Sequence, residues 1–598
     1  MYSPRSVDGM LHQLSWMVGG QQGEGIDPTG SILSKALNRQ GYFIYGYRHF
    51  SSRIKGGHSH YKVRISTKPR LSNADALDML VAFDQETIDL NARELKPGGL
   101  ILGDSKFKPS VDRNDVQLLH IPLTEIAEGL GSRIMKNMVA IGATTAILGI
   151  DPSIFTDMIK KQFARKGDKI VQANLEAIRK GAESAKEQLN PKTDFTLAPA
   201  DGKSRLLMMG NDAISLGAMA AGCRVMPAYP ITPASDIMES LVKRLPEIGG
   251  VVLQTEDEIA AVITAIGASY AGARAMTATS GPGLSLMMEA IGLSGMTETP
   301  LVIVDTQRGG PSTGLPTKNE QSDLNTVLYG SHGEIPRIVL APSTAEECFY
   351  DTVHAFNYAE QYQCPVILMT DLALSLALQT VEQLDYSQVK ISRGKLLSDE
   401  EVAALTDENG YFPRYADSPD GISPRAMPGQ KGGIHYVTGV EHNEIGRPLE
   451  GTANREKMMK KRMRKLENVQ LPNSLITREK DDAEWLIVGF GSTRGPIEEA
   501  REQLAADGIP TSHLHIRVLA PFPTQSVKDV LSRYERVLVV ENNATGQLAA
   551  QLRQYVGDIS TIYSQTKFNG DPYYPSEITE HVKELMAHGN SQRLSYVR

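Results

Sequence analysis

Short apolar runs, each ending in a cluster of Gly, Pro, Asp or Thr, fill the middle of the chain and restrict its fold more than any other feature. Longer segments with helical character lie between them, such as the alanine-rich stretch 258–273. This alternation predicts a parallel β-sheet with helices on both faces. Because ligands bind beyond the carboxyl ends of such strands, we expect chemistry in the loops that follow. The predicted strands are Val225–Tyr229, Val251–Thr255, Ala275–Thr279, Leu301–Asp305, Ile338–Ala341 and Val366–Asp371.

The chain divides into three α/β blocks. The first and last blocks show the same alternation, and the last opens with an apolar strand at Trp485–Gly491. A polar stretch without apolar periodicity separates the first two blocks, and a region dense in Gly and Pro precedes the last. We therefore predict a first domain at 1–190, a linker at 191–203, a second domain at 204–387, an irregular connector with a basic helix at 388–478 and a third domain at 479–598.

Charge and hydropathy exclude several classes of protein. The 598 residues carry a formal net charge of −8, and the pI is near 6.0. This balance is not typical of a dedicated nucleic-acid binder, which usually has a basic face. The uncharged apolar run 138–150 is shorter than the ~20 residues that span a bilayer. The first ten residues lack the basic start and apolar core of a signal peptide. We expect a cytoplasmic protein that binds neither nucleic acid nor membrane.

Cysteine usage limits the metal chemistry of the chain. There are three cysteines, Cys223, Cys348 and Cys364, and none forms a CxxC pair. Because an iron–sulfur cluster normally takes four thiolates, we expect this chain alone to hold none. A Cys-rich zinc site is equally disfavoured, and the three residues are interpreted as small buried apolar side chains.

Two loops after the predicted strands carry groups suited to an anion. In Tyr229-Pro230-Ile231-Thr232-Pro233, two prolines fix the backbone around the hydroxyl of Thr232. The loop 308–318 holds Arg308, whose guanidinium suits bidentate carboxylate binding, together with several hydroxyls. Either could instead be an ordinary turn with a surface side chain, and the residues alone do not decide.

Three consecutive acids, Glu256, Asp257 and Glu258, stand between a predicted strand and the apolar helix that follows. Acids at a helix N-terminus are stabilised by the helix dipole, so capping is one interpretation. The alternative concerns Glu258, because an acid at the start of an apolar helix is partly desolvated. Such a carboxyl has a raised pKa and can share a proton with a ring nitrogen.

The first block contains two further candidate loops. Gly19–Gly25 is glycine-rich and precedes a predicted helix, which suits either a turn or an anion site. Its spacing lacks the ending of a phosphate-binding P-loop. The segment 47–58 follows a predicted strand and carries Arg48, His49, Arg53 and Lys55, so it is either a carboxylate-binding loop or a solvated basic loop.

The connector contains one helix with a mixed character. Residues 454–466 read NREKMMKKRMRKL and place Met459, Met463 and Leu466 on one stripe. The segment is either a docking helix for an acidic partner or a solvated helix with a modest apolar seam.

The order of these motifs is more specific than any one of them. YPITPAS, EDEIAA, TSGPGLSLM and RGGPSTGLPTK, in that order, resemble the α chain of the 2-oxoacid:ferredoxin oxidoreductases. The first block, with RIKGGH, resembles that family's γ domain, fused ahead of the α domain, and the whole is most similar to the 2-oxoglutarate-specific members. The resemblance implies a γ-type domain, a thiamine-pyrimidine-binding domain and a domain like the transketolase C-terminal domain.

The resemblance also implies roles for single residues. Glu258, with Glu256 as its rival, would bond the aminopyrimidine ring of thiamine diphosphate and so activate the coenzyme. Arg308, Thr232 and Thr317 would hold the substrate carboxylate, and Lys55 would stabilise charge near the reacting carbon. Arg48, His49 and Arg53, which are near Lys55 in the sequence, are candidates for a distal carboxylate. Expected contacts of the coenzyme are Tyr229, Pro230, Ile231, Gly281 and Pro282.

In this family the coenzyme lies between two chains. The resemblance implies a β chain that carries Mg²⁺, the diphosphate site and a 4Fe–4S cluster, with ferredoxin as acceptor and coenzyme A as cosubstrate. A dimer of αβ heterodimers is expected. One alternative is the same chemistry on pyruvate, a branched-chain or an aryl 2-oxoacid. The other is a non-catalytic scaffold that binds coenzyme A or a nucleotide, which the presence of both Glu258 and Arg308 disfavours.

Overall fold

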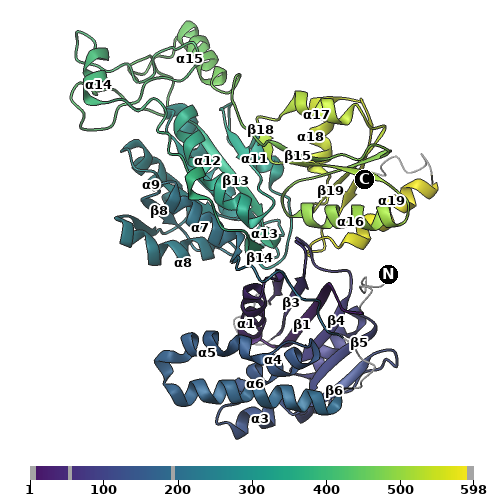
Figure 1. The fold of residues 1–598 in the computed structure, drawn as a ribbon. Coiled ribbons are helices and arrows are strands. Elements are labelled where there is room, and N and C mark those ends of the chain that lie inside the picture. The colour runs from purple at the N-terminus through teal and green to yellow at the C-terminus, as the bar shows by residue number, and fades with distance from the viewer. Residues whose placement is uncertain (1–8, 51–56, 190–194, 589–598) are drawn as a thin grey trace. The chain divides into compact units, whose positions relative to one another are not determined.

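A computed structural model describes residues 9–50, 57–189 and 195–588 (Figure 1). The chain forms two compact units. The first unit comprises the chain up to Met208 together with Ala377–Gln383, and the second comprises Met209–Leu376 with the chain from Leu384 onward. No helix within the described ranges is both long enough and apolar enough to cross a membrane.

A mixed eight-stranded sheet forms the centre of the first unit. Its order is β6-β5-β4-β1-β3-β2-β14-β7, and β1 pairs antiparallel with β3 and parallel with β4. The strands are β1 (Gln13–Gln21), β2 (Phe43–His49), β3 (His58–Ser66), β4 (Leu77–Ala82), β5 (Leu95–Asp104), β6 (Gln117–Ile121), β7 (Leu206–Met209) and β14 (Leu378–Val381).

Helices α4 and α6 lie side by side in this unit (Figure 1). Gly142 of α4 and Gly181 of α6 permit the close approach, because an added Cβ at either would collide with the main chain of the other helix. The helices of the unit are α1 (Ile26–Arg39), α2 (Gln85–Asn91), α3 (Leu123–Gly129), α4 (Lys136–Ile147), α5 (Thr156–Phe163) and α6 (Asp168–Gln188).

Parts of the chain that the sequence assigned elsewhere complete the first unit. Strands β7 and β14 come from the stretch 204–387, which we predicted as a second domain. Part of the predicted linker also packs here, since Phe195 and Leu197 are buried in the core of this unit. Apolar periodicity could not reveal these additions, because each segment is only a few residues long.

The second unit contains the predicted parallel sheet. Its order is β10-β11-β13-β12-β18, parallel except that β12 pairs antiparallel with β18 from the third block. Strands β8 and β9 form a separate parallel pair. The strands are β8 (Val225–Ala228), β9 (Val251–Gln254), β10 (Met276–Thr279), β11 (Leu301–Gln307), β12 (Ile338–Leu340), β13 (Pro365–Asp371) and β18 (Val518–Ala520).

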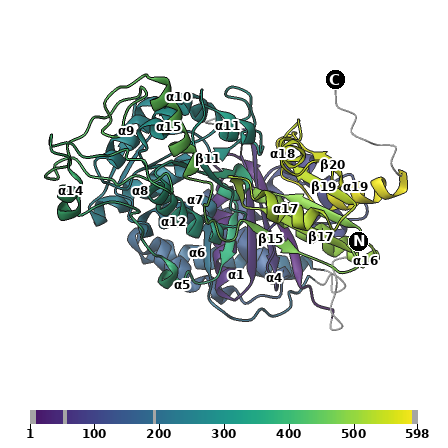
Figure 2. The same ribbon diagram turned by 90° about the horizontal axis from the view of Figure 1, so that it is seen from above.

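Helices cover this sheet, and α7 packs against α12 in both views (Figures 1 and 2). Gly217 of α7 meets the main chain of Phe349 there. The helices are α7 (Gly210–Ala220), α8 (Ser235–Arg244), α9 (Glu258–Tyr270), α10 (Gly281–Thr297), α11 (Leu324–Tyr329), α12 (Ala345–Tyr362) and α13 (Leu372–Leu376).

A second five-stranded sheet, ordered β15-β17-β16-β19-β20, forms the C-terminal domain within the same unit. Helices α16 and α19 pack on one face of it, and α17 and α18 on the other. The elements are β15 (Leu475–Arg478), β16 (Trp485–Gly489), β17 (Thr511–Ile516), β19 (Arg536–Glu541), β20 (Thr561–Thr566), α16 (Arg494–Ala506), α17 (Thr524–Leu531), α18 (Gln547–Val556) and α19 (Pro575–His588).

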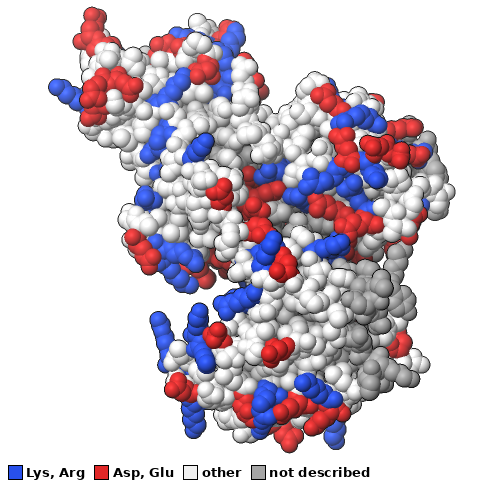
Figure 3. Space-filling view, in the orientation of Figure 1, with Lys and Arg blue, Asp and Glu red and all other residues white. Residues whose placement is uncertain are grey.

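Buried ion pairs hold the connector, which contains α14 (Asp399–Leu405) and α15 (Thr452–Arg464). Glu298, at the C-terminal end of α10, pairs with both Lys461 of α15 and Lys465, each at 2.6 Å, and all three side chains are inaccessible to solvent. Glu360 of α12 is paired with three arginines, Arg274, Arg393 and Arg425. A segment with little regular structure is thereby fixed to the domain that precedes it. Over the face drawn in Figure 3, acidic and basic side chains are interspersed.

Candidate active site

Glu258 is the first residue of α9, and its side chain is buried although two other acids precede it. Asp257 caps the helix by accepting a hydrogen bond from the Ala260 amide at 2.8 Å. Glu256 is exposed. Within the part of the chain that the structure describes, no group donates a hydrogen bond to the Glu258 carboxylate. Of the three acids, only Glu258 is a buried carboxylate available to a ligand.

The start of α10 is bracketed by two carboxyl groups. An added Cβ at Gly283 would come within 2.5 Å of Glu258 Oε1, and one at Gly281 within 2.7 Å of Asp323 Oδ1. Glycine is therefore required at both positions for the carboxyl groups to approach the helix. The helix dipole favours negative charge at this end.

Arg308 is a buried cation whose hydrogen bonds to the described residues all go to main-chain oxygens. It donates from Nη1 to the carbonyl of Thr232 at 2.6 Å and from Nη2 to the carbonyl of Thr313 at 3.2 Å. Among the described residues, no carboxylate lies within ion-pair distance of it. Burial lowers the pKa of Arg308, and the charges of Asp323 and Glu258 offset part of that shift. The guanidinium thus retains a positive charge that a ligand carboxylate can neutralise.

Asp305 and Asp323 form an acidic pair that sequence reasoning missed. Asp305 is completely buried near the end of β11, and neither of its carboxyl oxygens has a hydrogen-bond partner among the described residues. Burial raises the pKa of Asp305 well above its ordinary value, and the charge of Asp323 adds to the shift. Burial, with the charge of Glu320, raises the pKa of Asp323 to about 7. An aspartate inside an apolar strand was the only available signal, and it identifies Asp305 alone.

The remaining predicted residues of this unit surround these groups. Arg308 joins the loop of Thr232 to its own loop, but through the carbonyl of Thr232 rather than the hydroxyl that the sequence favoured. Thr317 is half-buried on the loop that carries Arg308, and Gly281 and Pro282 open α10. Tyr229 and Pro230 are exposed, and Ile231 is half-buried.

Arg48 and His49 end strand β2 in the first unit. Arg48 lies 3.6 Å from Asp27 of α1, and the His49 ring stacks on His60 with centroids 4.8 Å apart. Arg53 and Lys55 fall outside the described residues. The first unit therefore presents part of the predicted cationic loop as an ordered strand end.

The glycine-rich segment 19–25 is filled by the protein's own groups. Glu24 pairs with Lys136 at 2.8 Å, and an added Cβ at Gly25 would collide with the Asn137 side chain. The start of α1 is thus occupied by an internal acid, which favours the structural interpretation of this loop over an anion site.

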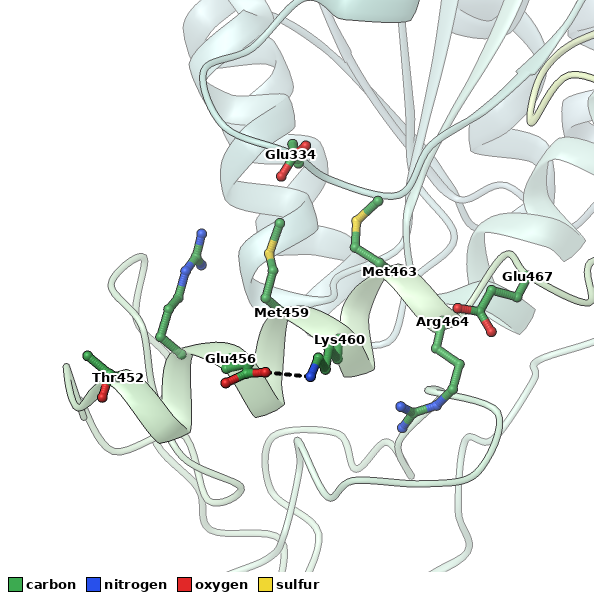
Figure 4. Close-up of a pocket in the computed structure, with 9 residues that line it drawn as sticks. Glu334, Thr452, Glu456, Met459, Lys460, Met463, Arg464 and Glu467 are labelled. Carbon is green, nitrogen blue, oxygen red and sulfur yellow. Dashed lines mark hydrogen bonds and ion pairs between the residues drawn. The ribbon is translucent and has the colours of Figure 1, made fainter. Parts of the chain in front are cut away.

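A surface groove with a volume of about 690 Å³ lies elsewhere, along α15. Figure 4 shows Met459 and Met463 projecting from the helix toward the segment that carries Glu334. None of the predicted site residues lines this groove. The described residues also contain no group of three or more His, Cys, Asp or Glu side chains placed to hold a metal ion.

Three protein families match successive parts of the chain. Residues 15–184 match pyruvate ferredoxin/flavodoxin oxidoreductase, and residues 216–462 match the thiamine diphosphate-binding part of pyruvate flavodoxin/ferredoxin oxidoreductase. Residues 483–578 match core domain II of pyruvate:ferredoxin oxidoreductase. The matches cover all three α/β blocks.

Similar proteins extend over nearly the full length. The alpha subunit of 2-oxoacid:ferredoxin oxidoreductase 2 from Aeropyrum pernix is 33% identical over 97% of this chain and 98% of its own. The 2-oxoglutarate oxidoreductase subunit KorA from Mycobacterium tuberculosis is 32% identical over 95% of this chain and 91% of its own. A solved structure of 2-oxoglutarate:ferredoxin oxidoreductase from Magnetococcus marinus, with 2-oxoglutarate, coenzyme A and succinyl-CoA bound, has a TM-score of 0.88. It shares 36% identity and covers 96% of this chain and 99% of its own.

Proposed function

The chain belongs to the 2-oxoacid:ferredoxin oxidoreductases as an alpha-type subunit, and from this premise we propose that its substrate is 2-oxoglutarate. The proposed reaction converts 2-oxoglutarate and coenzyme A to succinyl-CoA and CO₂, with electrons passing singly to ferredoxin, and it can run in reverse as a carboxylation. The observation that carries the proposal is Arg308, a buried guanidinium that, among the described residues, donates hydrogen bonds to carbonyls alone and is influenced by the charge of Glu258.

Thiamine diphosphate, when bound, supplies the nucleophilic carbon that attacks the 2-oxo group. The residues present fit its pyrimidine half, because Glu258 offers a buried carboxylate to which no described residue donates a hydrogen bond, next to Gly281 and Gly283 at the start of α10. A buried carboxylate of this kind can hold a proton at a ring nitrogen. We assign this role to Glu258 rather than Glu256, which is exposed. Tyr229, Pro230, Ile231, Gly281 and Pro282 are the proposed contacts of the ring.

Arg308 is the proposed anchor of the carboxylate that leaves as CO₂. Both of its outer nitrogens are already oriented by carbonyls, so little side-chain freedom remains to be lost on binding. Its planar donor array matches a carboxylate. Thr317, on the same loop, and Thr232, whose carbonyl Arg308 binds, are the proposed neutral contacts.

Selectivity for a five-carbon diacid requires a second cation. Arg48, His49 and Arg53 are the proposed partners of the distal carboxylate, and Lys55 is proposed to stabilise charge at the reacting carbon. The names of relatives support this choice, since KorA of Mycobacterium tuberculosis and the solved structure from Magnetococcus marinus are both assigned to 2-oxoglutarate. The alpha subunit from Aeropyrum pernix is named only for 2-oxoacids, so a broader substrate range is the competing outcome.

A second subunit is needed to complete the coenzyme site. Large apolar side chains are exposed on three elements near Glu258, namely α9, which it begins, β9, which precedes it, and α10: Ile259, Ile263, Val251, Leu253 and Leu286. Exposed apolar groups clustered in this way are typical of an interface. We propose that a β-type chain covers this surface and supplies Mg²⁺, the diphosphate contacts and the 4Fe–4S cluster that passes electrons to ferredoxin. All three cysteines of the present chain are buried and unpaired. A dimer of αβ heterodimers is the proposed assembly.

The test is turnover by the chain purified with its β-type partner. Reduction of ferredoxin should require thiamine diphosphate, Mg²⁺, coenzyme A and a 2-oxoacid. The kcat/KM for 2-oxoglutarate should exceed that for pyruvate by at least about 100-fold, because a site built for a distal carboxylate leaves a buried cation unpaired when pyruvate binds. Equal turnover of pyruvate, branched-chain or aryl 2-oxoacids would remove the assignment to 2-oxoglutarate. No turnover of any 2-oxoacid would favour a binding scaffold.

Matched arginines test the anchor. Arg308→Lys should raise KM for every 2-oxoacid by roughly 10- to 100-fold, because a lysine cannot reproduce the two oriented donors. Arg337 is the control, since it is equally buried and also donates to two carbonyls, those of Val327 and Gly330. Arg337→Lys should leave KM unchanged. Similar KM values for Arg308→Lys and the wild type would exclude Arg308 as the carboxylate anchor.

A further inference from the structure

Gln321 is completely buried and uses every polar group it has. Its amide N–H donates to the carbonyl of Asn542 at 2.6 Å, and its Oε1 accepts from the Asn542 amide at 3.1 Å. Its Nε2 donates to Asp371 Oδ2 at 2.9 Å and to the carbonyl of Phe490 at 3.0 Å. Its own carbonyl accepts from Asn543 Nδ2 at 3.2 Å. One side chain thus joins groups that lie far apart in the sequence.

Three strand ends converge on this glutamine. Asp371 ends β13 of the parallel sheet, while Phe490 and Asn542 directly follow β16 and β19 of the C-terminal domain. Gly491, with a φ of +59°, permits the approach, because an added Cβ there would lie 2.8 Å from Gln321 Nε2. Asn543 is itself fixed by Glu541, to which it donates at 2.7 Å. The C-terminal domain therefore presents a rigid surface to Gln321.

Hydrogen bonds join the two halves of the loop that carries Arg308, next to Gln321. Gln307, which precedes Arg308, accepts from the Asp323 amide at 3.1 Å, and the Gly309 amide donates to the Lys318 carbonyl at 3.0 Å. Arg308 also donates to Thr313 on the same loop. Residues 318–323 form the returning half of this loop, and any displacement of them therefore also moves the guanidinium of Arg308.

The C-terminal domain binds that returning half at further points. The Asn319 amide donates to the carbonyl of Gly570 at 2.9 Å, and Gln547 Nε2 donates to the carbonyl of Ser322 at 3.0 Å. Asn319 and Ser322 lie on either side of Gln321 in the sequence, and each forms a single hydrogen bond of this kind through its main chain. The Lys318 ammonium group also lies 3.2 Å from Asp571 Oδ1. Gln321 bonds the C-terminal domain through both its side chain and its main chain, with four hydrogen bonds to Phe490, Asn542 and Asn543.

We propose that Gln321 is a positioning residue through which the C-terminal domain, to which sequence reasoning gave no catalytic role, sets the placement of the carboxylate anchor Arg308. The proposal rests on the proposed function for its kinetic consequence, but its structural part concerns only this chain. Gln321 is completely buried and its polar groups are engaged within the protein, so the proposal gives it no contact with substrate or coenzyme. It acts by holding one side of a loop whose other side carries Arg308.

The first test is Gln321→Met in the assembly of the chain with its β-type partner. The substitution keeps the volume and removes the side-chain hydrogen bonds. KM for the 2-oxoacid should rise about 10- to 100-fold with a much smaller change in kcat, because misplacement of a binding group acts mainly on capture of substrate. Half-saturation by thiamine diphosphate should not change. Amide hydrogen exchange in residues 309–318 should accelerate.

Gln551→Met is the matched control. Gln551 is a buried glutamine of the C-terminal domain, and its Nε2 donates to the Leu519 carbonyl, remote from the loop in sequence. Its replacement removes a similar bond from the C-terminal domain without releasing residues 318–323. KM and exchange in residues 309–318 should equal those of the wild type, whatever happens to the melting temperature.

Gln321→Glu supplies a readout that a loss of packing would not give. The new carboxyl would face Asp371, whose pKa burial already raises, with Glu541 held behind Asn543. At pH 6 the pair can share a proton and replace the lost donor, whereas at pH 8 two carboxylates would repel each other. The KM defect of this variant should therefore be small at pH 6 and approach that of Gln321→Met at pH 8.

The outcomes separate this proposal from the proposed function. A wild-type assembly that turns over no 2-oxoacid would overturn the function, and the exchange rates of residues 309–318 would still decide the role of Gln321. Unchanged KM and unchanged exchange in Gln321→Met would overturn the positioning role while leaving the function intact. Equal effects of Gln321→Met and Gln551→Met on KM would overturn it as well.

Discussion

Acids lie at both ends of helix α10, but the two ends differ in whether a described residue forms an ion pair with the acid. At the N-terminal end, the carboxyl groups of Glu258 and Asp323 lie against Gly283 and Gly281, and no described residue forms an ion pair with either. At the C-terminal end, Glu298 is completely buried and pairs with both Lys461 and Lys465. One helix thus separates acids without internal partners from an acid with two.

The helix dipole makes this difference informative. It stabilises acids at the N-terminal end and destabilises them at the C-terminal end, where Glu298 stands. Burial raises the pKa of Glu298, but the charges of Lys465 and Lys461 outweigh it, and the net shift is downward. Glu298 is therefore a structural charge that the protein itself neutralises. Glu258 has no such partner, which is expected of a group that serves a ligand.

Replacing glutamate by glutamine at each end of α10 gives the sharpest contrast. The larger effect is expected for Glu258→Gln, and it is an effect on turnover. It should lower 2-oxoacid turnover by about 10²–10⁴-fold, the range for loss of a general acid or base. The melting temperature should change little, because no internal hydrogen bond is lost. Glu256→Gln is the control and should keep full activity, since that side chain is exposed. If Glu256→Gln were inactive and Glu258→Gln active, the assignment of the two acids would be reversed.

Glu298→Gln should instead reduce stability. It leaves two ammonium groups buried without their counter-ion, and breaking such a network costs about 3–5 kcal/mol. Chemical denaturation of the full chain would measure the loss. Adding Lys465→Met should recover part of it, because one unpaired charge is then removed. Glu456→Gln on the exposed face of α15 is the control, and it should have no measurable effect. A Glu298→Gln variant as stable as wild type would mean that the network adds no stability.

Motif order singled out Glu258 and Arg308 of the candidate site, but not the acids Asp305 and Asp323 that lie near them. Glu258, Arg308 and Thr232 each follow a recognisable strand, and such spacing survives in the sequence. Asp323 lies 15 residues beyond Arg308, inside a loop without periodicity. It reaches α10 only because Gln307 and the C-terminal domain hold that loop, and those bonds join residues that no local pattern relates.

The fold shows the same division. The strands of the parallel sheet start or end within a residue or two of the predicted limits, because buried strands carry long apolar runs. The stripe predicted on the basic helix, Met459, Met463 and Leu466, is half-buried or exposed, and the buried face of the helix is a different one. Met458, Lys461 and Arg462 are buried there, whereas Met463 is exposed. Apolar periodicity does not indicate the buried face because lysine and arginine occupy it, and their pairing with Glu298 and Glu441 explains that.

Asp323→Asn tests the N-terminal end of α10, where the acids have no basic partner among the described residues. The measurement is the pH dependence of stability. The pKa of Asp323 is raised to about 7, above the roughly 3.9 of an unfolded chain, so the folded state holds the proton more tightly. The resulting stabilisation is full below about pH 4 and is lost as pH rises through 7. The wild type should therefore lose stability relative to Asp323→Asn between pH 5 and 7, by on the order of 1 kcal/mol per pH unit. Denaturation midpoints across this range would measure it. A constant difference between the two proteins would show that Asp323 is already ionised at pH 5.

The smallest effect is expected on the outer face of α15, whose inner face neutralises Glu298. Met463 is 42% exposed and lines the groove of Figure 4, so Met463→Ser removes little buried area. Stability should stay within about 0.5 kcal/mol of wild type, and KM should not change. Met458→Ser is the control on the same helix and should destabilise by about 2–4 kcal/mol, because that side chain is completely buried. A loss of assembly or of activity in Met463→Ser would mean that this face, too, is completed by a partner, as we propose for the surface around Glu258.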